Sequence, residues 1–152
     1  MVDSYPVVRV LVVDDFEPFR HFVRAKLQTR PGLQVVGEAS DGLEAIQKAE
    51  ELQPHLILLD IGLPALNGID AADRISTLLP DAVILFISQN NDADVVAGAL
   101  NDGARGYVLK PDANRELLPA VEAVLRGEHF ASAGVAQRRA SGTLPYSRNI
   151  SI

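Results

Sequence analysis

Short apolar runs alternate five times with amphipathic stretches along the chain. The runs are rich in β-branched residues and too short for helices, which is typical of strands buried on both faces. The predicted strands are 8–13, 33–37, 56–59, 82–87 and 107–109. After each strand, apolar side chains recur at helical spacing. These stripes predict five helices (Phe19, Phe22, Val23 and Leu27; Leu43, Ile46, Ala49 and Leu52; Ile69, Ala72, Ile75 and Leu78; Val95, Val96, Ala99 and Leu100; Leu117, Leu118, Val121, Val124 and Leu125).

A strand–helix unit repeated five times predicts an α/β fold with a parallel sheet and helices on both faces. At this chain length the natural arrangement is a flavodoxin-like, doubly wound, five-stranded sheet with the strand order 2-1-3-4-5. We expect one domain over residues 7–129. Residues 130–152 lose the periodicity, so we expect a flexible C-terminal tail or linker remnant that contains no DNA-binding domain.

Composition narrows the class of protein. The chain has 152 residues, no cysteine and a net charge of −6, which excludes thiolate metal sites and disfavours non-specific nucleic-acid binding. No apolar run has the length of a membrane span, and the first residues lack the pattern of a signal peptide. We therefore expect a cytoplasmic protein that does not contact a membrane.

Polar residues follow four of the predicted strands. Asp14 and Asp15 follow the first, Asp60 the third, Ser88 the fourth and Lys110 the fifth. Sites in open α/β sheets form at the carboxyl ends of the strands, so these side chains should converge. Taken singly, each has an ordinary structural role, such as helix capping by an Asp or a Ser. Taken together and in this order, they indicate a functional site.

The chemistry of this group favours a divalent cation and phosphate. Three close carboxylates repel one another unless a cation neutralises them, and ligands with oxygen donors alone favour Mg²⁺ or Mn²⁺. Such a metal can bridge a carboxylate and a phosphoryl oxygen. A carboxylate placed there is a candidate nucleophile that would form an aspartyl phosphate.

Four segments carry a resemblance to a known family: VLVVDD (10–15), LILLDIGLPALNGID (56–70), ILFIS (84–88) and GARGYVLKP (103–111). From about Arg9 to Gly127 the chain resembles the receiver domain of two-component response regulators. The amino-acid sequences of the second and fourth segments are most similar to the NarL/LuxR branch, whose members usually carry a C-terminal helix-turn-helix.

The resemblance implies a role for each polar position. Asp60 matches the phosphoacceptor, and Asp14 and Asp15 match the acidic pair that holds Mg²⁺. Asp60 and the backbone carbonyl of Gly62 would supply further ligands. Lys110 matches the family's lysine.

The resemblance also implies a switch. Ser88 matches the switch hydroxyl, and Tyr107 matches the aromatic side chain that turns inward when Ser88 moves. The Lys110–Pro111 bond matches one that is often cis. Gly62, Gln89 and Asn90 stand where the family tunes the lifetime of the phosphorylated state. The sequence leaves open whether that lifetime is short or long.

The implied partners are a sensor histidine kinase or a phosphotransfer protein, with a homodimer as an open alternative. DNA would be reached only through a domain that is not in this sequence. The implied protein is a signalling receiver, which assists its own phosphorylation and dephosphorylation, and not an enzyme. Two alternatives stay open: a degenerate receiver that acts as an interaction module, and a haloacid-dehalogenase-type phosphatase. The second lacks its usual second Asp, since Phe16 stands there.

Overall fold

A parallel sheet of six strands, in the order β2-β1-β3-β4-β5-β6, forms the centre of the protein in the computed structural model, which describes residues 7–101 and 103–132. The predicted order 2-1-3-4-5 is confirmed for the first five strands. The strands are β1 (Val8–Val13), β2 (Leu33–Ala39), β3 (Leu56–Leu59), β4 (Val83–Ser88), β5 (Gly106–Leu109) and β6 (Phe130–Ala131). The helices are α1 (Glu17–Leu27), α2 (Gly42–Leu52), α3 (Gly68–Leu78), α4 (Ala93–Asn101) and α5 (Ala113–Leu125), with a 3₁₀ turn at Lys110–Asp112.

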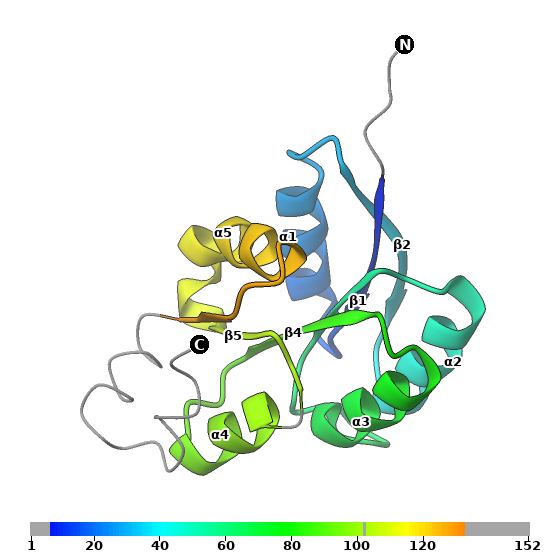
Figure 1. Ribbon diagram of the computed structural model, residues 1–152, viewed down its shortest axis with the longest axis vertical. Helices are drawn as coiled ribbons and strands as arrows, with labels where there is room; N and C mark the ends of the chain where they lie inside the picture. The colour runs from blue at the N-terminus through cyan, green and yellow to red at the C-terminus, as the bar shows by residue number, and fades with distance from the viewer. Residues whose placement is uncertain (1–6, 102, 133–152) are drawn as a thin grey trace.

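The helices lie in two layers, one on each face of the sheet (Figure 1). Helices α1 and α5 pack on one face, where Val23 and Leu117 are fully buried. Helices α2, α3 and α4 pack on the other face, where Ile75 and Ala99 are fully buried. Each central strand is apolar on both sides because both faces are covered.

Local sequence fixes where the helices begin. Pro18 lies in the first turn of α1, where its missing N–H costs nothing. The side chain of Asp41 accepts a hydrogen bond from the backbone N–H of Glu44 at 2.7 Å and caps α2. The side chain of Asn67 caps α3 in the same way. The loops that lead into these helices are therefore short and fixed at the carboxyl end of the sheet.

The sixth strand was not predicted. Phe130 and Ala131 pair in parallel with β5, so the domain extends past the expected boundary at residue 129. The strand was missed because two residues show no alternation of apolar and polar positions. The remainder of the expected flexible tail, residues 133–152, lies outside the described residues.

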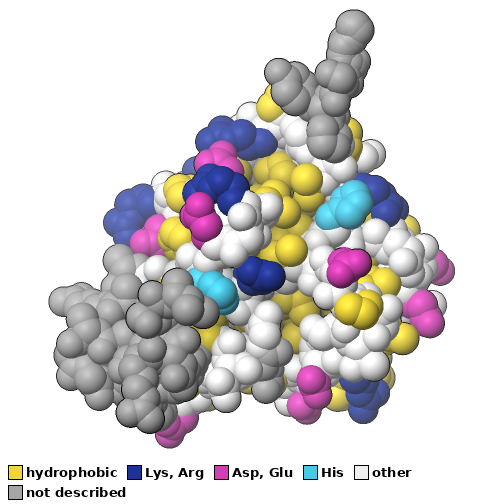
Figure 2. Space-filling view, viewed as in Figure 1, with side chains coloured by type: hydrophobic (Ala, Val, Ile, Leu, Met, Phe, Trp, Pro, Cys, Tyr) yellow, Lys and Arg dark blue, Asp and Glu magenta, His cyan; other side chains and the backbone are white. Residues whose placement is uncertain are grey.

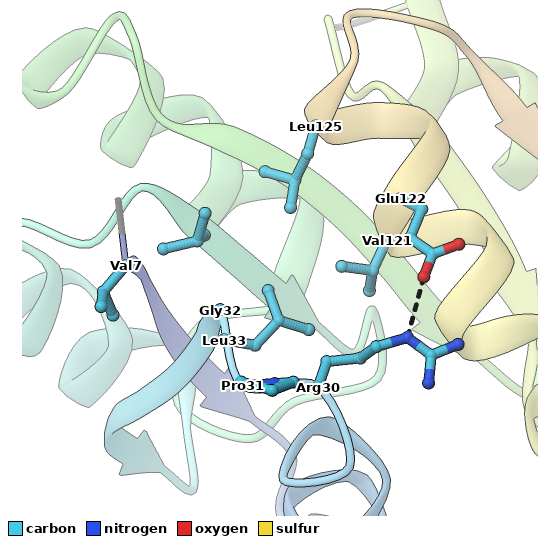
Figure 3. A pocket seen from close by; sticks show the side chains of 9 residues that line it. Val7, Arg30, Pro31, Gly32, Leu33, Val121, Glu122 and Leu125 are labelled. Carbon is cyan, nitrogen blue, oxygen red and sulfur yellow. Dashed lines mark hydrogen bonds and ion pairs between the residues drawn. The ribbon is translucent and has the colours of Figure 1, made fainter. Parts of the chain in front are cut away.

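An apolar hollow of about 460 Å³ lies where β1 and β2 begin, at the end of the sheet opposite the polar strand ends. Its walls come from β1, the turn before β2, and α5, and an ion pair of 2.9 Å between Arg30 and Glu122 spans two of these elements (Figure 3). Hydrophobic side chains also surface between charged ones on the face in Figure 2. Among the described residues, none of the helices is both long and apolar enough to cross a membrane.

Candidate phosphoacceptor site

Three carboxylates meet at the carboxyl end of the sheet. Asp14 follows β1 directly, Asp15 comes next, and Asp60 follows β3. One oxygen atom from each lies within 4.8 Å of the others. Asp14 and Asp60 are buried, with 2% and 7% of their surface exposed, while Asp15 is exposed. The adjacency of β1 and β3 in the sheet produces this cluster from residues far apart in sequence.

Lys110 supplies the positive charge of the site. Its Nζ atom lies 2.6 Å from Oδ2 of Asp14 and 3.3 Å from Oδ2 of Asp60. The ring of Phe19 lies below the same ammonium group, with its centroid 4.5 Å away, within the range of a cation–π contact. Burial alone would lower the pKa of Lys110, but the contact with Asp14 and the charges of both carboxylates raise it above its ordinary value. Lys110 is therefore a fixed cation.

Asp14 is short of compensation despite this ion pair. Its Oδ1 atom accepts a hydrogen bond of 2.8 Å from the backbone N–H of Phe16. Its Oδ2 atom is buried and has no hydrogen bond of good geometry within the described residues. Burial, together with the charge of Asp60, raises the pKa of Asp14, and these effects outweigh the lowering by Lys110 and Phe16. An additional cation among the three carboxylates would fit this environment.

The loop after β3 is held close to Asp60. The backbone N–H of Gly62 donates to Oδ1 of Asp60 at 3.3 Å, and the N–H of Gly68 donates to the carbonyl of Ile61 at 2.7 Å. A Cβ atom on Gly68 would overlap the carbonyl oxygen of Asp60 and lie 2.7 Å from Cα of Ile61. No atom lies within 4 Å of a Cβ built on Gly62. Glycine at 68 is thus required by packing, whereas Gly62 leaves open space beside Asp60.

Ser88, Asn90 and Tyr107 form one hydrogen-bonded group beside the carboxylates. Oγ of Ser88 accepts from the backbone N–H of Asn90 at 3.1 Å, and the hydroxyl of Tyr107 donates to the backbone carbonyl of Asn90 at 2.5 Å. Tyr107 is fully buried, and its ring centroid lies 6.2 Å from that of Phe86. Burial raises the pKa of Tyr107 to about 12, against a smaller lowering by the nearby hydroxyl of Ser88. The structure thus contains Tyr107 in the inward position.

These residues border a cavity of about 470 Å³ that opens to solvent. Its lining residues come from the ends of β1, β3, β4 and β5 (Asp15, Phe16, Asp60, Ile61, Gly62, Ser88, Gln89, Asn90 and Lys110). Gln89 is exposed on its wall. The polar groups predicted at the strand ends are therefore neighbours in space, and a small anion has a path to Asp60.

The expectation of a cis Lys110–Pro111 bond is wrong, because the described residues contain no cis peptide bond. Pro111 lies instead in the 3₁₀ turn between β5 and α5, where the fixed φ of proline suits a trans chain entering a helical turn.

Two further residues of the site were missed at the sequence level. Phe19 was assigned only to the core side of its helix, yet its ring contacts Lys110. Arg20 donates to the backbone carbonyl of Asp14 at 2.7 Å and pairs with Glu38 at 2.9 Å. Both contacts arise because α1 packs beside the end of β1. A single sequence contains no signal for the distance between these two elements.

The comparisons with known proteins agree with this geometry. The family model described as the response regulator receiver domain matches residues 10–122. The chain is 37% identical over 122 residues to the transcriptional regulatory protein LiaR of Bacillus subtilis (strain 168). The aligned region covers 80% of this chain and 58% of that protein. The chain is also 38% identical over 124 residues to the nitrate/nitrite response regulator protein NarL of Escherichia coli (strain K12). Here the aligned region covers 81% of this chain and 57% of that protein. The chain thus spans less than two thirds of the length of these relatives.

A solved structure of a LuxR-family two-component response regulator from Aurantimonas sp. SI85-9A1 superposes with a TM-score of 0.85 at 34% identity, covering 90% of this chain and 97% of that one. The family match favours a receiver over a phosphatase of the haloacid-dehalogenase type. The chain therefore belongs to the family of response regulator receiver domains, and its relatives are response regulators of the NarL/LuxR kind.

Proposed function

We propose that this receiver accepts a phosphoryl group on Asp60 from a histidine kinase or a phosphotransfer protein, in a Mg²⁺-dependent reaction in the cytoplasm. One observation carries the proposal: the Asp60 carboxylate borders an open cavity, within 4.8 Å of two further carboxylates and 3.3 Å from the Lys110 ammonium. A carboxylate placed this way is accessible to a phosphoryl donor and surrounded by the groups that such a donor needs.

The donor set suits a hard divalent cation. Asp14, Asp15 and Asp60 offer carboxylate oxygens only, and Oδ2 of Asp14 is buried without a hydrogen bond of good geometry within the described residues. We assign these three residues as the ligands of Mg²⁺ or Mn²⁺, with the backbone carbonyl of Gly62 as a fourth. The bound ion would neutralise the carboxylates and the incoming phosphoryl oxygens.

Each remaining group has a defined part in the transfer. An oxygen of Asp60 forms a bond to phosphorus while the bond between phosphorus and the donor nitrogen breaks, and the freed imidazole takes up a proton. Lys110, already beside Asp60, would shift its contact to a phosphoryl oxygen. Oγ of Ser88 accepts from the N–H of Asn90, and its own proton would be donated to another phosphoryl oxygen. To reach that oxygen the Ser88 side chain would move, and this movement would weaken its bond with Asn90.

The movement of Ser88 toward the phosphoryl group would drive the switch. Tyr107 bonds to the backbone carbonyl of Asn90, so a change at Ser88 and Asn90 alters the support of the Tyr107 ring. A shift in the population of the inward position would change the surface of α4, β5 and α5, which a partner or a second copy could recognise. Gly62, Gln89 and Asn90 border the same cavity and would set how fast water removes the phosphoryl group. DNA binding would belong to an output domain such as the longer relatives have room for.

The test is the intact mass after incubation with acetyl phosphate and Mg²⁺. We expect the wild type to gain about 80 Da, the mass of one phosphoryl group, and Asp60→Asn to gain nothing. The matched control is Asp73→Asn, which makes the same change on the exposed surface of α3 and should be modified like the wild type. Chelation of Mg²⁺ should abolish the gain.

Two results would count against the proposal. A gain that persists in Asp60→Asn would place the acceptor on another side chain. A wild type that stays unmodified with both acetyl phosphate and a histidine kinase active on related receivers would favour a degenerate receiver acting only through its surface.

A further inference from the structure

The last described residues of the chain lie alongside β5, the strand that contains Tyr107 and ends next to Lys110. After α5 the chain turns back and forms β6, in which Phe130 pairs with Gly106 and Ala131 pairs with Tyr107. The next residue, Ser132, is fully buried. Buried polar groups are usually hydrogen-bonded, so the partners of Ser132 indicate what holds it in place.

Ser132 makes three hydrogen bonds, and together they join three elements. Its backbone N–H donates to the carbonyl of Tyr107 at 2.9 Å. Its Oγ accepts from the backbone N–H of Leu109 at 2.7 Å and donates to Oε1 of Glu116 at 2.6 Å. The hydroxyl therefore connects the end of β5 to α5, and the backbone connects β5 to the departing chain.

We propose that Ser132 is a positioning residue of the phosphoryl switch, which holds the end of β5 so that Lys110 and Tyr107 are correctly placed. Leu109, whose N–H it binds, is bonded directly to Lys110. Tyr107, whose carbonyl it binds, is the buried aromatic residue at the Ser88–Asn90 group. The inference rests on the proposed function, because it assigns Ser132 a part in phosphorylation at Asp60.

The position of Ser132 also links the site to whatever follows it in the chain. Any change that displaces Ser132 acts on two backbone groups of β5, the carbonyl of Tyr107 and the N–H of Leu109. Coupling between two sites is reciprocal, so a change at Lys110 and Tyr107 would alter the exit of the chain in turn.

The three carboxylates give a way to separate this role from a general effect on folding. Asp14, Asp15 and Asp60 follow β1 and β3, and neither strand contacts Ser132 through any of the three hydrogen bonds described above. A loosened β5 would displace the Lys110 ammonium, which competes with a metal ion for Asp14 and Asp60, so it should impair phosphoryl transfer without weakening Mg²⁺ binding. A merely structural role would weaken both quantities or neither.

The experiment compares Ser132→Ala with Ser132→Thr, which retains the hydroxyl. The rate of phosphorylation by acetyl phosphate is measured by intact mass, and Mg²⁺ affinity by calorimetry without the phosphodonor. We expect Ser132→Ala to lower the rate roughly tenfold, as small displacements of positioning groups do. Its Mg²⁺ affinity should be no weaker than that of the wild type, and Ser132→Thr should recover most of the rate. Ile75→Val, a core change in α3 on a different element, controls for lost stability and should leave the rate unchanged.

Glu116→Ala is the second variant, in case Ser132→Ala does not fold. It removes the α5 end of the bridge and should lower the rate in the same direction, again with Mg²⁺ affinity retained. An unchanged rate in a folded Ser132→Ala, or parallel losses of rate and Mg²⁺ affinity, would overturn the inference. A wild type that is never phosphorylated would instead overturn the proposed function, so the two failures are distinguishable.

Discussion

At the scale of single residues, charge balance dominates the site. Three carboxylates face one ammonium group, and like charges about 4 Å apart repel by roughly 4 kcal/mol at an effective dielectric near 20. The raised pKa of Asp14 is a consequence of its burial and of this imbalance. The same imbalance makes the site receptive to a divalent cation and, with that cation present, to a phosphoryl group.

Absorbance titration of the Tyr107 phenol tests whether this side chain is buried in the folded protein. Since burial raises its pKa to about 12, Tyr107 should stay protonated while an unfolded chain would ionise near pH 10. The contribution of Tyr107 to stability should therefore be constant below about pH 10. It should fall by up to about 3 kcal/mol between roughly pH 10 and 12, where the unfolded state has lost the proton and the folded state keeps it.

The control for this titration is Tyr107→Phe. The difference between its curve and that of the wild type removes the contribution of Tyr5 and Tyr146, which lie outside the described residues. Ionisation of Tyr107 near pH 10 in folded protein would contradict the inward, buried position.

At the scale of elements, the loop between β3 and α3 is built around one close approach. Gly68 begins α3 against the backbone of Asp60, so the positions of the helix and of Asp60 are set by the same contact. Asn67 caps the helix and thereby fixes its first turn. The position of the Asp60 carboxylate depends on a residue with no side chain.

Gly68→Ala should therefore destabilise the protein by roughly 1–3 kcal/mol, the usual cost of overpacking. It should also slow phosphorylation, because either Asp60 or α3 must move. Chemical denaturation and the mass assay measure the two effects. Gly98→Ala is the matched control: it lies in α4 with open space around its Cβ, and should stabilise by about 0.5–1 kcal/mol. Equal effects of the two substitutions would refute the packing argument.

The sequence predicts most elements because their signals are local. Buried strands form apolar runs, helices form stripes, and polar residues stand where the strands end. The convergence of Asp60 and Lys110 could be predicted, since the carboxyl ends of parallel strands share one edge of the sheet. Strand β6 and the contact of Phe19 with Lys110 could not, because each depends on how an element packs and not on its own pattern.

At the scale of the whole molecule, the two ends of the sheet differ in character. The carboxyl end carries the charged cavity, and the opposite end carries the apolar hollow crossed by Arg30 and Glu122 (Figure 3). These two residues are 92 positions apart in sequence and join the turn before β2 to α5. The charged site lies at one end of the sheet. Substitutions at the other end should therefore affect the stability of the fold and not the site.

A double-mutant cycle with Arg30→Ala and Glu122→Ala measures that ion pair. Both side chains are 47% exposed, so we expect a coupling of about 0.2–1 kcal/mol and unchanged phosphorylation. Urea denaturation of the four proteins measures the coupling, and the mass assay measures phosphorylation. A coupling well above this range, or slower phosphorylation, would show that the two ends of the sheet are energetically linked.

Strand β6 covers part of a sheet edge at which aggregation could begin. An uncovered outer strand offers free N–H and C=O groups to neighbouring molecules, and such edges promote aggregation. The two residues of β6 and the adjoining Ser132 occupy these groups along β5. A chain shortened to residue 129 would retain every element of the expected five-stranded fold, yet it would expose that row to intermolecular pairing. The length of β5 that stays open to pairing at this edge of the sheet thus depends on three residues that look, in sequence, like the beginning of a linker.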